Sequence, residues 1–189
     1  MYLTYIQKVL SALNSVPSQD INRFIATLLH HYTFENNIFI IGNGGSAANA
    51  SHFCEDLSIG TLSDFKQQKR FRVYSLTDNS PAITAWGNDD GYDNIFKNQL
   101  QNLIQANDLL IAISGSGNSK NILNAVDYVN GRNIEQNINT FSFTGFDGGL
   151  LKNKTRYGIH VVSDNMGIVE SVHDIIFHYV ISVLKEKIK

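Results

Sequence analysis

Five short apolar segments that alternate with helical segments are the feature that most constrains the fold of this chain. Each segment has four to six residues, and they lie at 37–41, 71–76, 109–113, 140–143 and 158–162. Such alternation implies a parallel sheet whose two faces are both covered by helices. Because crossovers between parallel strands are right-handed, we expect a doubly wound, three-layer α/β/α sandwich.

The segments between and around these strands have the spacing or composition of helices. Apolar residues recur at helical spacing over residues 2–15 and 19–33, ahead of the first strand. Further helices are expected from residue 46, near 82–86, over 118–129 and over 167–187. A length of 189 residues suits one domain. We therefore expect a single domain over 1–189, with N-terminal helices over 1–34 and an α/β core with its C-terminal helix over 35–189.

Charge and cysteine content argue against several kinds of partner. The formal net charge is −2, so nothing attracts the chain to nucleic acid or to a membrane surface. Cys54 is the single cysteine, which excludes an internal disulfide and a multi-cysteine zinc site. The first residues lack a signal-peptide pattern, and no run of consecutive apolar residues approaches 18. We expect a soluble, cytoplasmic protein.

Glycine- and serine-rich loops follow the first and third predicted strands, at residues 42–46 and 114–119. In a sheet of order 2-1-3-4-5 these two loops are neighbours at the point where the strand order reverses, which is where such sheets bind ligands. Each loop leads into a helix, whose free N–H groups attract anions. Four serine hydroxyls could therefore converge on one phosphate group: those of Ser46, Ser114, Ser116 and Ser119.

Other interpretations of the same loops have less support. The spacing from Gly42 to Ala47 also fits a dinucleotide-binding fingerprint, but that fingerprint expects an acidic residue about 20 positions later, at the end of the second strand, and none stands there. The first candidate, Asp78, comes 36 residues after Gly42, and a second serine-rich loop is not expected there. Ordinary turn glycines and capping serines explain one loop more easily than both. A P-loop is excluded because no Gly-Lys-Ser/Thr follows.

The two loops are part of a longer series of motifs: IGNGGSAANASHFCEDL, GNDDGY, AISGSGNSKNIL, FTGFDGG and VESVHDIIFHYV. In this order they resemble the sugar isomerase (SIS) domain, and more narrowly the phosphoheptose isomerases of bacterial heptose biosynthesis. The resemblance implies a flavodoxin-like core with a five-stranded parallel sheet of order 2-1-3-4-5. It also implies a homotetramer with active sites at subunit interfaces, which converts sedoheptulose 7-phosphate to D-glycero-D-manno-heptose 7-phosphate through an enediol.

The resemblance also implies roles for individual residues. The phosphosugar would be bound by Asn43, Gly44, Gly45, Ser46, Asp89, Ser114, Gly115, Ser116 and Ser119, where Gly115 replaces the family's usual threonine. Asp56 would be the catalytic base and His178 the acid. Many members bind zinc, and the matching ligand positions here are His52, Asp56, Glu170 and His178.

The expected catalytic positions are consistent in part with helix geometry. His52 and Asp56 are four residues apart, so they share one face of a helix. Glu170 and His178 are eight apart, a rise of about 12 Å, so sharing one ion would stretch both side chains. His173 is an alternative to His178, whereas His30 and His31 are expected at the surface.

Besides Gly115, four further positions depart from the family pattern: Asp56 replaces glutamate, Glu170 replaces glutamine, Gly60 replaces arginine and Gly167 replaces aspartate. These departures leave two alternatives to the heptose isomerase. One is a non-catalytic SIS module that binds phosphosugars or partner proteins, such as the module that binds a replication initiator. The other is an isomerase of a different phosphosugar.

Overall fold

A five-stranded sheet forms the centre of the computed structural model, which describes the backbone of residues 1–189 and all side chains except those of 133–135. The strand order is β2-β1-β3-β4-β5, and every neighbouring pair is parallel. This confirms the expected topology. The strands are β1 (Asn37–Ile41), β2 (Arg72–Ser75), β3 (Leu109–Ser114), β4 (Asn139–Thr144) and β5 (Tyr157–His160).

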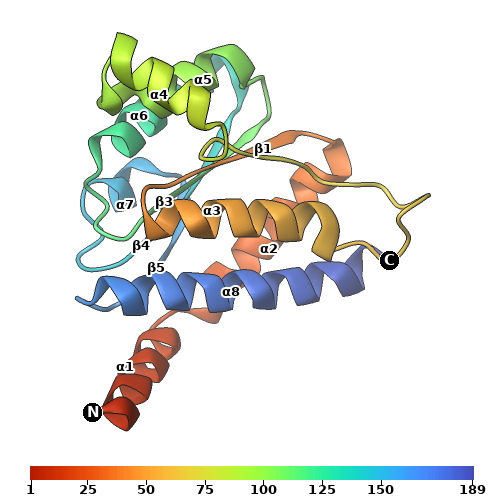
Figure 1. Cartoon of the computed structure of the whole chain (residues 1–189). Helices are drawn as coiled ribbons and strands as arrows, with labels where there is room; N and C mark the ends of the chain where they lie inside the picture. The colour runs from red at the N-terminus through yellow and green to blue at the C-terminus, as the bar shows by residue number, and fades with distance from the viewer.

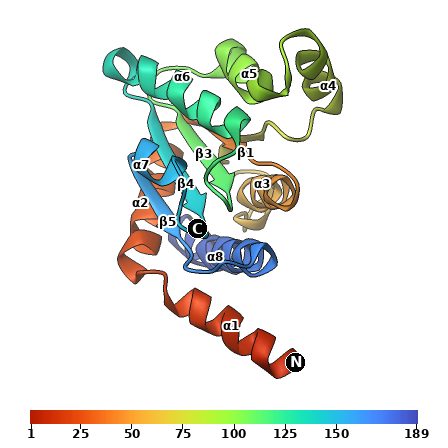
Figure 2. The ribbon, with the colours of Figure 1, turned by 90° about the vertical axis from the view of Figure 1, so that its left-hand side faces the viewer.

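Helices cover both faces of the sheet, as Figures 1 and 2 show. The helices are α1 (Tyr2–Asn14), α2 (Ser18–Phe34), α3 (Gly45–Glu55), α4 (Ser80–Asp89), α5 (Ile95–Leu103), α6 (Lys120–Gln136), α7 (Leu151–Lys154) and α8 (Met166–Lys187), with a π-helical turn η1 (Asp56–Gly60) and a 3₁₀ turn η2 (Tyr92–Asn94). One face carries α2, α3 and α8, with α1 projecting beyond α8. The other face carries α4 to α7.

Residues of β1 show why its sequence is continuously apolar. Successive side chains of a strand point to opposite faces of the sheet. Ile38 and Ile40 accordingly pack in the core beneath α2, α3 and α8, whereas Phe39 and Ile41 pack in the core beneath α5 and α6. A strand that is buried on both faces needs an apolar residue at every position.

The long helix α8 packs against α1, α2 and α3, and its Phe177 contacts Phe143 of β4. By length and composition alone it would pass for a membrane span, yet half of its most apolar window is buried inside the protein. Its buried residues, such as Val172, Phe177 and Leu184, belong to the same core as α2 and α3. We interpret α8 as a core helix.

Two expectations from the sequence need correction. Helix α5 was not anticipated, although Ile95, Phe96 and Leu100 bury one face of it. His31 was expected at the surface but is only 1% exposed. It follows Phe24 and Leu28 on the buried stripe of α2, and burial is the main reason why its pKa is lowered to about 4.

Candidate functional site

The two glycine- and serine-rich loops lie side by side at the carboxyl ends of β1 and β3. These strands are paired, with Ile41 opposite Ala112, so the loops that follow them emerge together. They line one pocket of about 240 Å³. We call this pocket the phosphate cradle; its lining residues are Asn43, Gly44, Gly45, Ser46, Ile113, Ser114, Gly115, Ser116, Ser119, Met166 and Glu170.

The cradle suits a phosphate because of its hydrogen-bond donors. Ser46 and Ser114 are almost fully buried, and Ser114 Oγ lies 3.5 Å from Ser119 Oγ. Helix α3 begins at Gly45 and α6 begins next to Ser119, so two helix N-termini with free N–H groups meet here. No lysine or arginine lines the pocket, within the side chains that the structure describes.

The loop after β4 holds the second cradle loop in shape. Gly145 N–H donates to the carbonyl of Gly115 (2.8 Å), and Leu151 N–H donates to that of Gly117 (3.0 Å). Gly117 has a positive φ of 65°, and a Cβ on it would collide with the carbonyl of Gly148. The FTGFDGG motif therefore supports the cradle.

A network of side-chain amides orients Asn43. Its side chain exchanges two hydrogen bonds with Asn121, at 2.8 and 2.9 Å, and accepts a third from the hydroxyl of Tyr92 at 3.0 Å. Asn121 is buried beneath the loop. Neither Asn121 nor Tyr92 was singled out from the sequence, although both lie within its motifs.

Two residues of α8 occupy the edge of the cradle. The carboxylate of Glu170 lies so close to Gly45 that a Cβ there would collide with it. The sulfur of Met166 fills the space in which a Cβ on Gly115 would stand. The threonine that the family usually has in place of Gly115 would therefore collide with Met166 in this placement.

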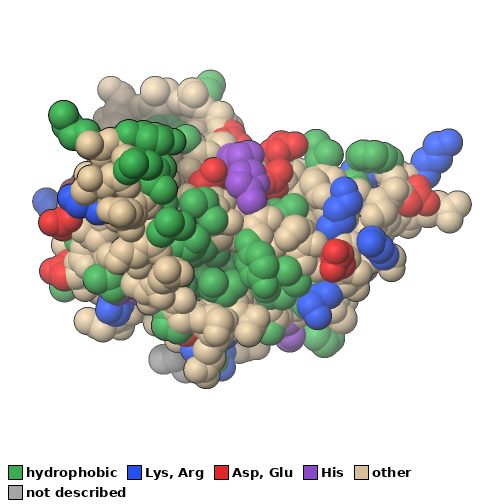
Figure 3. Space-filling model, turned by 90° about the horizontal axis from the view of Figure 1, so that it is seen from below, with side chains coloured by type: hydrophobic (Ala, Val, Ile, Leu, Met, Phe, Trp, Pro, Cys, Tyr) green, Lys and Arg blue, Asp and Glu red, His purple; other side chains and the backbone are tan. Residues whose placement is uncertain are grey.

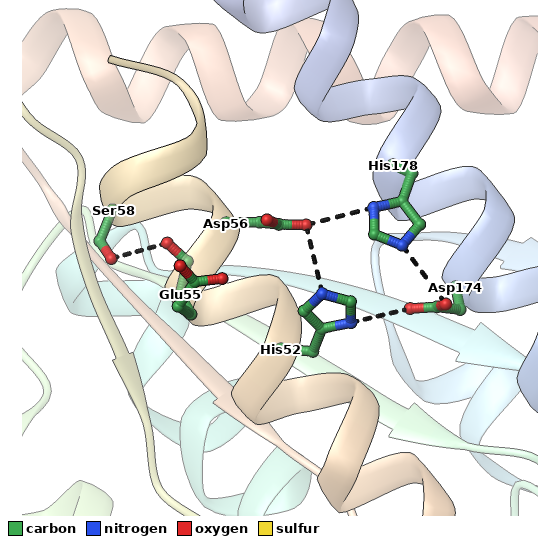
Figure 4. Close-up of polar contacts among 6 residues, drawn as sticks. All are labelled: His52, Glu55, Asp56, Ser58, Asp174 and His178. Atoms are coloured by element: carbon green, nitrogen blue, oxygen red, sulfur yellow. Dashed lines mark hydrogen bonds and ion pairs between the residues drawn. The ribbon is translucent and has the colours of Figure 1, made fainter.

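A second group of polar side chains lies farther along α3 and α8, as Figure 4 shows. Asp56 Oδ2 is 3.8 Å from His52 Nε2 and 3.3 Å from His178 Nδ1. One donor atom from each of these residues lies within 4.8 Å of the other two. Nitrogen and carboxylate oxygen are zinc ligands in proteins, so this triad fits a divalent metal.

Asp174 closes the triad into a ring. Its Oδ1 lies 3.3 Å from His52 Nδ1, and its Oδ2 lies 3.5 Å from His178 Nε2. Asp174 was not singled out from the sequence. Its spacing of four residues from His178 on one helix was the available signal.

Comparison with known proteins identifies the family. A sequence model of the SIS domain matches residues 1–136. The chain is 36% identical to a probable phosphoheptose isomerase of Thermoplasma acidophilum, covering 80% of each protein. It is 35% identical to the phosphoheptose isomerase of Helicobacter pylori, covering 92% of this chain and 84% of the relative. The chain belongs to the phosphoheptose isomerase family of SIS-domain proteins.

A solved structure of this family has the same fold. The phosphoheptose isomerase of Neisseria gonorrhoeae superposes with a TM-score of 0.85 at 25% identity. The match covers 98% of this chain and 97% of that one. The phosphoheptose isomerase fold thus extends over the N-terminal helices as well as the core.

Asp56 sits where helix α3 widens into the π-helical turn η1, a feature that often marks functional sites. A Cβ on Gly60 would lie 3.2 Å from Asp56 Oδ1, so the family's arginine at this position would stand beside the carboxylate. In this chain, ring nitrogens of His52 and His178 face the Asp56 carboxylate, among the side chains described.

Three residues considered from the sequence lie outside the triad. Glu170 faces the cradle and does not join the metal-binding group. Asp89 is exposed at the end of α4 and does not line the cradle. His173 is fully buried, with Nε2 3.3 Å from the carbonyl of Thr144, and burial is the main reason why its pKa is lowered to about 4. Of the two candidate histidines, His178 belongs to the triad and His173 does not.

Proposed function

We propose that this protein is a ketose–aldose isomerase that converts sedoheptulose 7-phosphate to D-glycero-D-manno-heptose 7-phosphate. One observation carries the proposal: the N-terminal ends of α3 and α8 line the phosphate cradle, and a carboxylate–imidazole pair lies farther along the same two helices. Membership of the phosphoheptose isomerase family supports it.

The separation between the phosphate cradle and the triad supports a substrate with a long carbon chain. The rise along α3 from Ser46 is about 9 Å to His52 and about 15 Å to Asp56. With its phosphate in the cradle, an extended seven-carbon chain brings C1 and C2 close to the triad. A triose phosphate would be too short.

The reaction needs a base that moves a proton between adjacent carbons and an acid that serves the oxygens. We assign the first role to Asp56 Oδ1, because Oδ2 already contacts both imidazoles. The carboxylate removes a proton from C1 and returns it to C2 of the enediol. While no metal is bound to it, His178 donates a proton to O2 and accepts the proton of O1.

Zinc is the proposed cofactor, and His52, Asp56 and His178 would hold it. When bound, a divalent ion polarises the sugar oxygens and stabilises negative charge on them. The expected fourth ligand, Glu170, lies at the cradle, where we propose that it contacts a sugar hydroxyl near the phosphate.

The assay is to incubate the protein with sedoheptulose 7-phosphate and to follow aldoheptose phosphate by NMR. Asp56→Asn should lower kcat by roughly 100- to 10,000-fold, because it removes the base. Glu55→Gln is the matched control, since Glu55 is exposed on another side of the helix. It should stay within about two-fold of wild type. Turnover at the wild-type rate by the Asp56→Asn variant would contradict the assignment.

Gly60 and Gly167, which remove an arginine and an aspartate of the family pattern, favour a second candidate, a non-catalytic phosphosugar-binding module. Binding of the sugar phosphate without turnover, weakened by Ser116→Ala, would assign that function. Turnover of a different ketose phosphate in the same assay would instead assign another isomerase.

Self-association is also part of the proposal. Apolar side chains are exposed on α1 and on the adjoining part of α8, and Figure 3 shows them gathered on one face. They are Tyr2, Leu3, Tyr5, Ile6, Leu10, Ile175 and Tyr179. We propose that this face joins subunits of a homotetramer, each subunit a single SIS domain over 1–189.

A further inference from the structure

The two aspartates in the ring of His52, Asp56, Asp174 and His178 use their carboxylate oxygens differently. A single oxygen of Asp56 faces both imidazoles, whereas Asp174 offers one oxygen to each. The contacts on the Asp56 side therefore converge on one point, and those on the Asp174 side diverge. Convergent atoms suit an ion, and divergent oxygens suit two separate N–H donors.

In the neutral form that binds a metal, imidazole itself leads to the same division. A neutral imidazole carries hydrogen on only one of its two ring nitrogens. Here both nitrogens of His52 and of His178 face carboxylate oxygens. Each neutral ring can thus donate to one aspartate only, and its other nitrogen directs a lone pair at the second aspartate. A cation on that second side removes the repulsion.

We propose that Asp174 is a positioning residue, which accepts Nδ1–H of His52 and Nε2–H of His178 and so fixes both tautomers. His52 Nε2 and His178 Nδ1 then face Asp56, ready to bind a metal. Such carboxylate–histidine–metal arrangements orient ligands and raise their basicity. This inference rests on the proposed function through the metal, and it replaces Glu170 by Asp174 as the fourth residue of the site.

Location supports Asp174 over Glu170. Glu170 lies one helical turn closer to the N-terminus of α8, where its carboxylate meets Gly45 and its carbonyl accepts from the side chain of Asn49 (2.9 Å). His52 contacts Asp174, and Asp56 contacts His178, at successive steps along the two helices. Residues of the two parallel helices therefore contact each other in order along the chain. In this register Asp174 lies beside His52 and His178.

The test measures Zn²⁺ affinity of the metal-stripped full-length protein, in competition with a chromophoric chelator. Asp174→Asn should weaken zinc binding roughly 10- to 100-fold, because the amide can accept from only one imidazole. Glu55→Gln removes the same charge nearby and should change the affinity by less than about two-fold. Affinity for inorganic phosphate, measured by calorimetry, should not change in Asp174→Asn and reports that the protein is folded.

A second measurement reads the tautomers directly. Long-range ¹H–¹⁵N spectra of the zinc-loaded wild type should show hydrogen on Nδ1 of His52 and on Nε2 of His178, and Asp174→Asn should broaden or shift these signals. Wild-type zinc affinity and unchanged spectra in Asp174→Asn would overturn the proposal, as would a wild type that binds no zinc at micromolar concentrations. Isomerase activity in wild type alongside either result would leave the proposed function standing.

Discussion

At the scale of single residues, the carboxylate of Glu170 is an unusual lining for a phosphate cradle. It lies against Gly45 at the N-terminus of α3, in the region that attracts an anionic ligand. Like charges repel at this range, and the partly exposed position reduces the effect without removing it.

We therefore predict that Glu170→Gln tightens binding of inorganic phosphate by roughly three- to ten-fold. Calorimetry at low ionic strength measures it. Glu186→Gln, in the last turns of the same helix, is the charge-matched control and should have no effect. Equal affinities for wild type and Glu170→Gln would show that the carboxylate does not reach the bound anion.

Two buried histidines predict how stability depends on pH. Burial lowers the pKa of His31 and of His173 to about 4, from 6.5 in an unfolded chain. As pH falls below 6.5 the unfolded state takes up protons that the folded state does not, so stability is full above pH 6.5 and is lost progressively toward pH 4. Urea midpoints between pH 7 and pH 4 measure this loss.

His173→Leu should make the same pH dependence shallower, because one of the two groups is removed. Its stability at pH 7 serves as the reference for the rest of the series. A slope equal to that of wild type would mean that His173 is not the group that takes up the proton on unfolding.

At the scale of elements, contact between two loops determines the shape of the cradle. A methyl group on Gly117 would collide with the carbonyl of Gly148. Gly117→Ala should therefore destabilise the protein by roughly 1–3 kcal/mol and weaken phosphate binding. Urea denaturation and calorimetry measure the two effects.

Gly131, within α6, differs from Gly117 because it has room for a side chain. A Cβ there meets no atom within 4 Å. Gly131→Ala should stabilise the protein by about 0.5–1 kcal/mol, since alanine is the better helix former. A loss of stability from Gly131→Ala, or none from Gly117→Ala, would contradict this account of the two glycines.

The meeting of the two loops could be predicted from the sequence because its signal is local. Serines and glycines that directly follow strands must lie at the carboxyl edge of a parallel sheet, and strand order then joins the two loops. Asp174 was missed for the opposite reason. Of its two partners, His52 lies on α3, more than 100 residues earlier in the chain, and only the register of two packed helices brings it to Asp174. The helical rise already indicated that Glu170 and His178 could share an ion only with strain.

The π-helical turn at Asp56 also escaped prediction. A change from i→i−4 to i→i−5 hydrogen bonding has no composition of its own. Helix α5 was missed because its polar residues, Asn98 and Gln99, are themselves buried and obscure the apolar stripe.

At the scale of the whole molecule, we predict that the exposed apolar face on α1 and α8 holds subunits together. Leu10→Glu places a charge in this face and should shift the protein to a lower mass in light scattering after size-exclusion chromatography. Phe65→Glu changes an apolar residue outside the face that is at least as exposed, and it should leave the mass unchanged. An identical mass for wild type and Leu10→Glu would assign the contact to another surface.

Helices α3 and α8 run side by side from the cradle toward the triad (Figure 1). Matching side chains recur every four residues, a rise of about 6 Å. Moving the two aspartates and two histidines by one such step would place the reactive carbons about 6 Å nearer to the phosphate. The position of the reactive residues along these two helices, in steps of one helical turn, thus determines the length of sugar that a protein with this fold can accept.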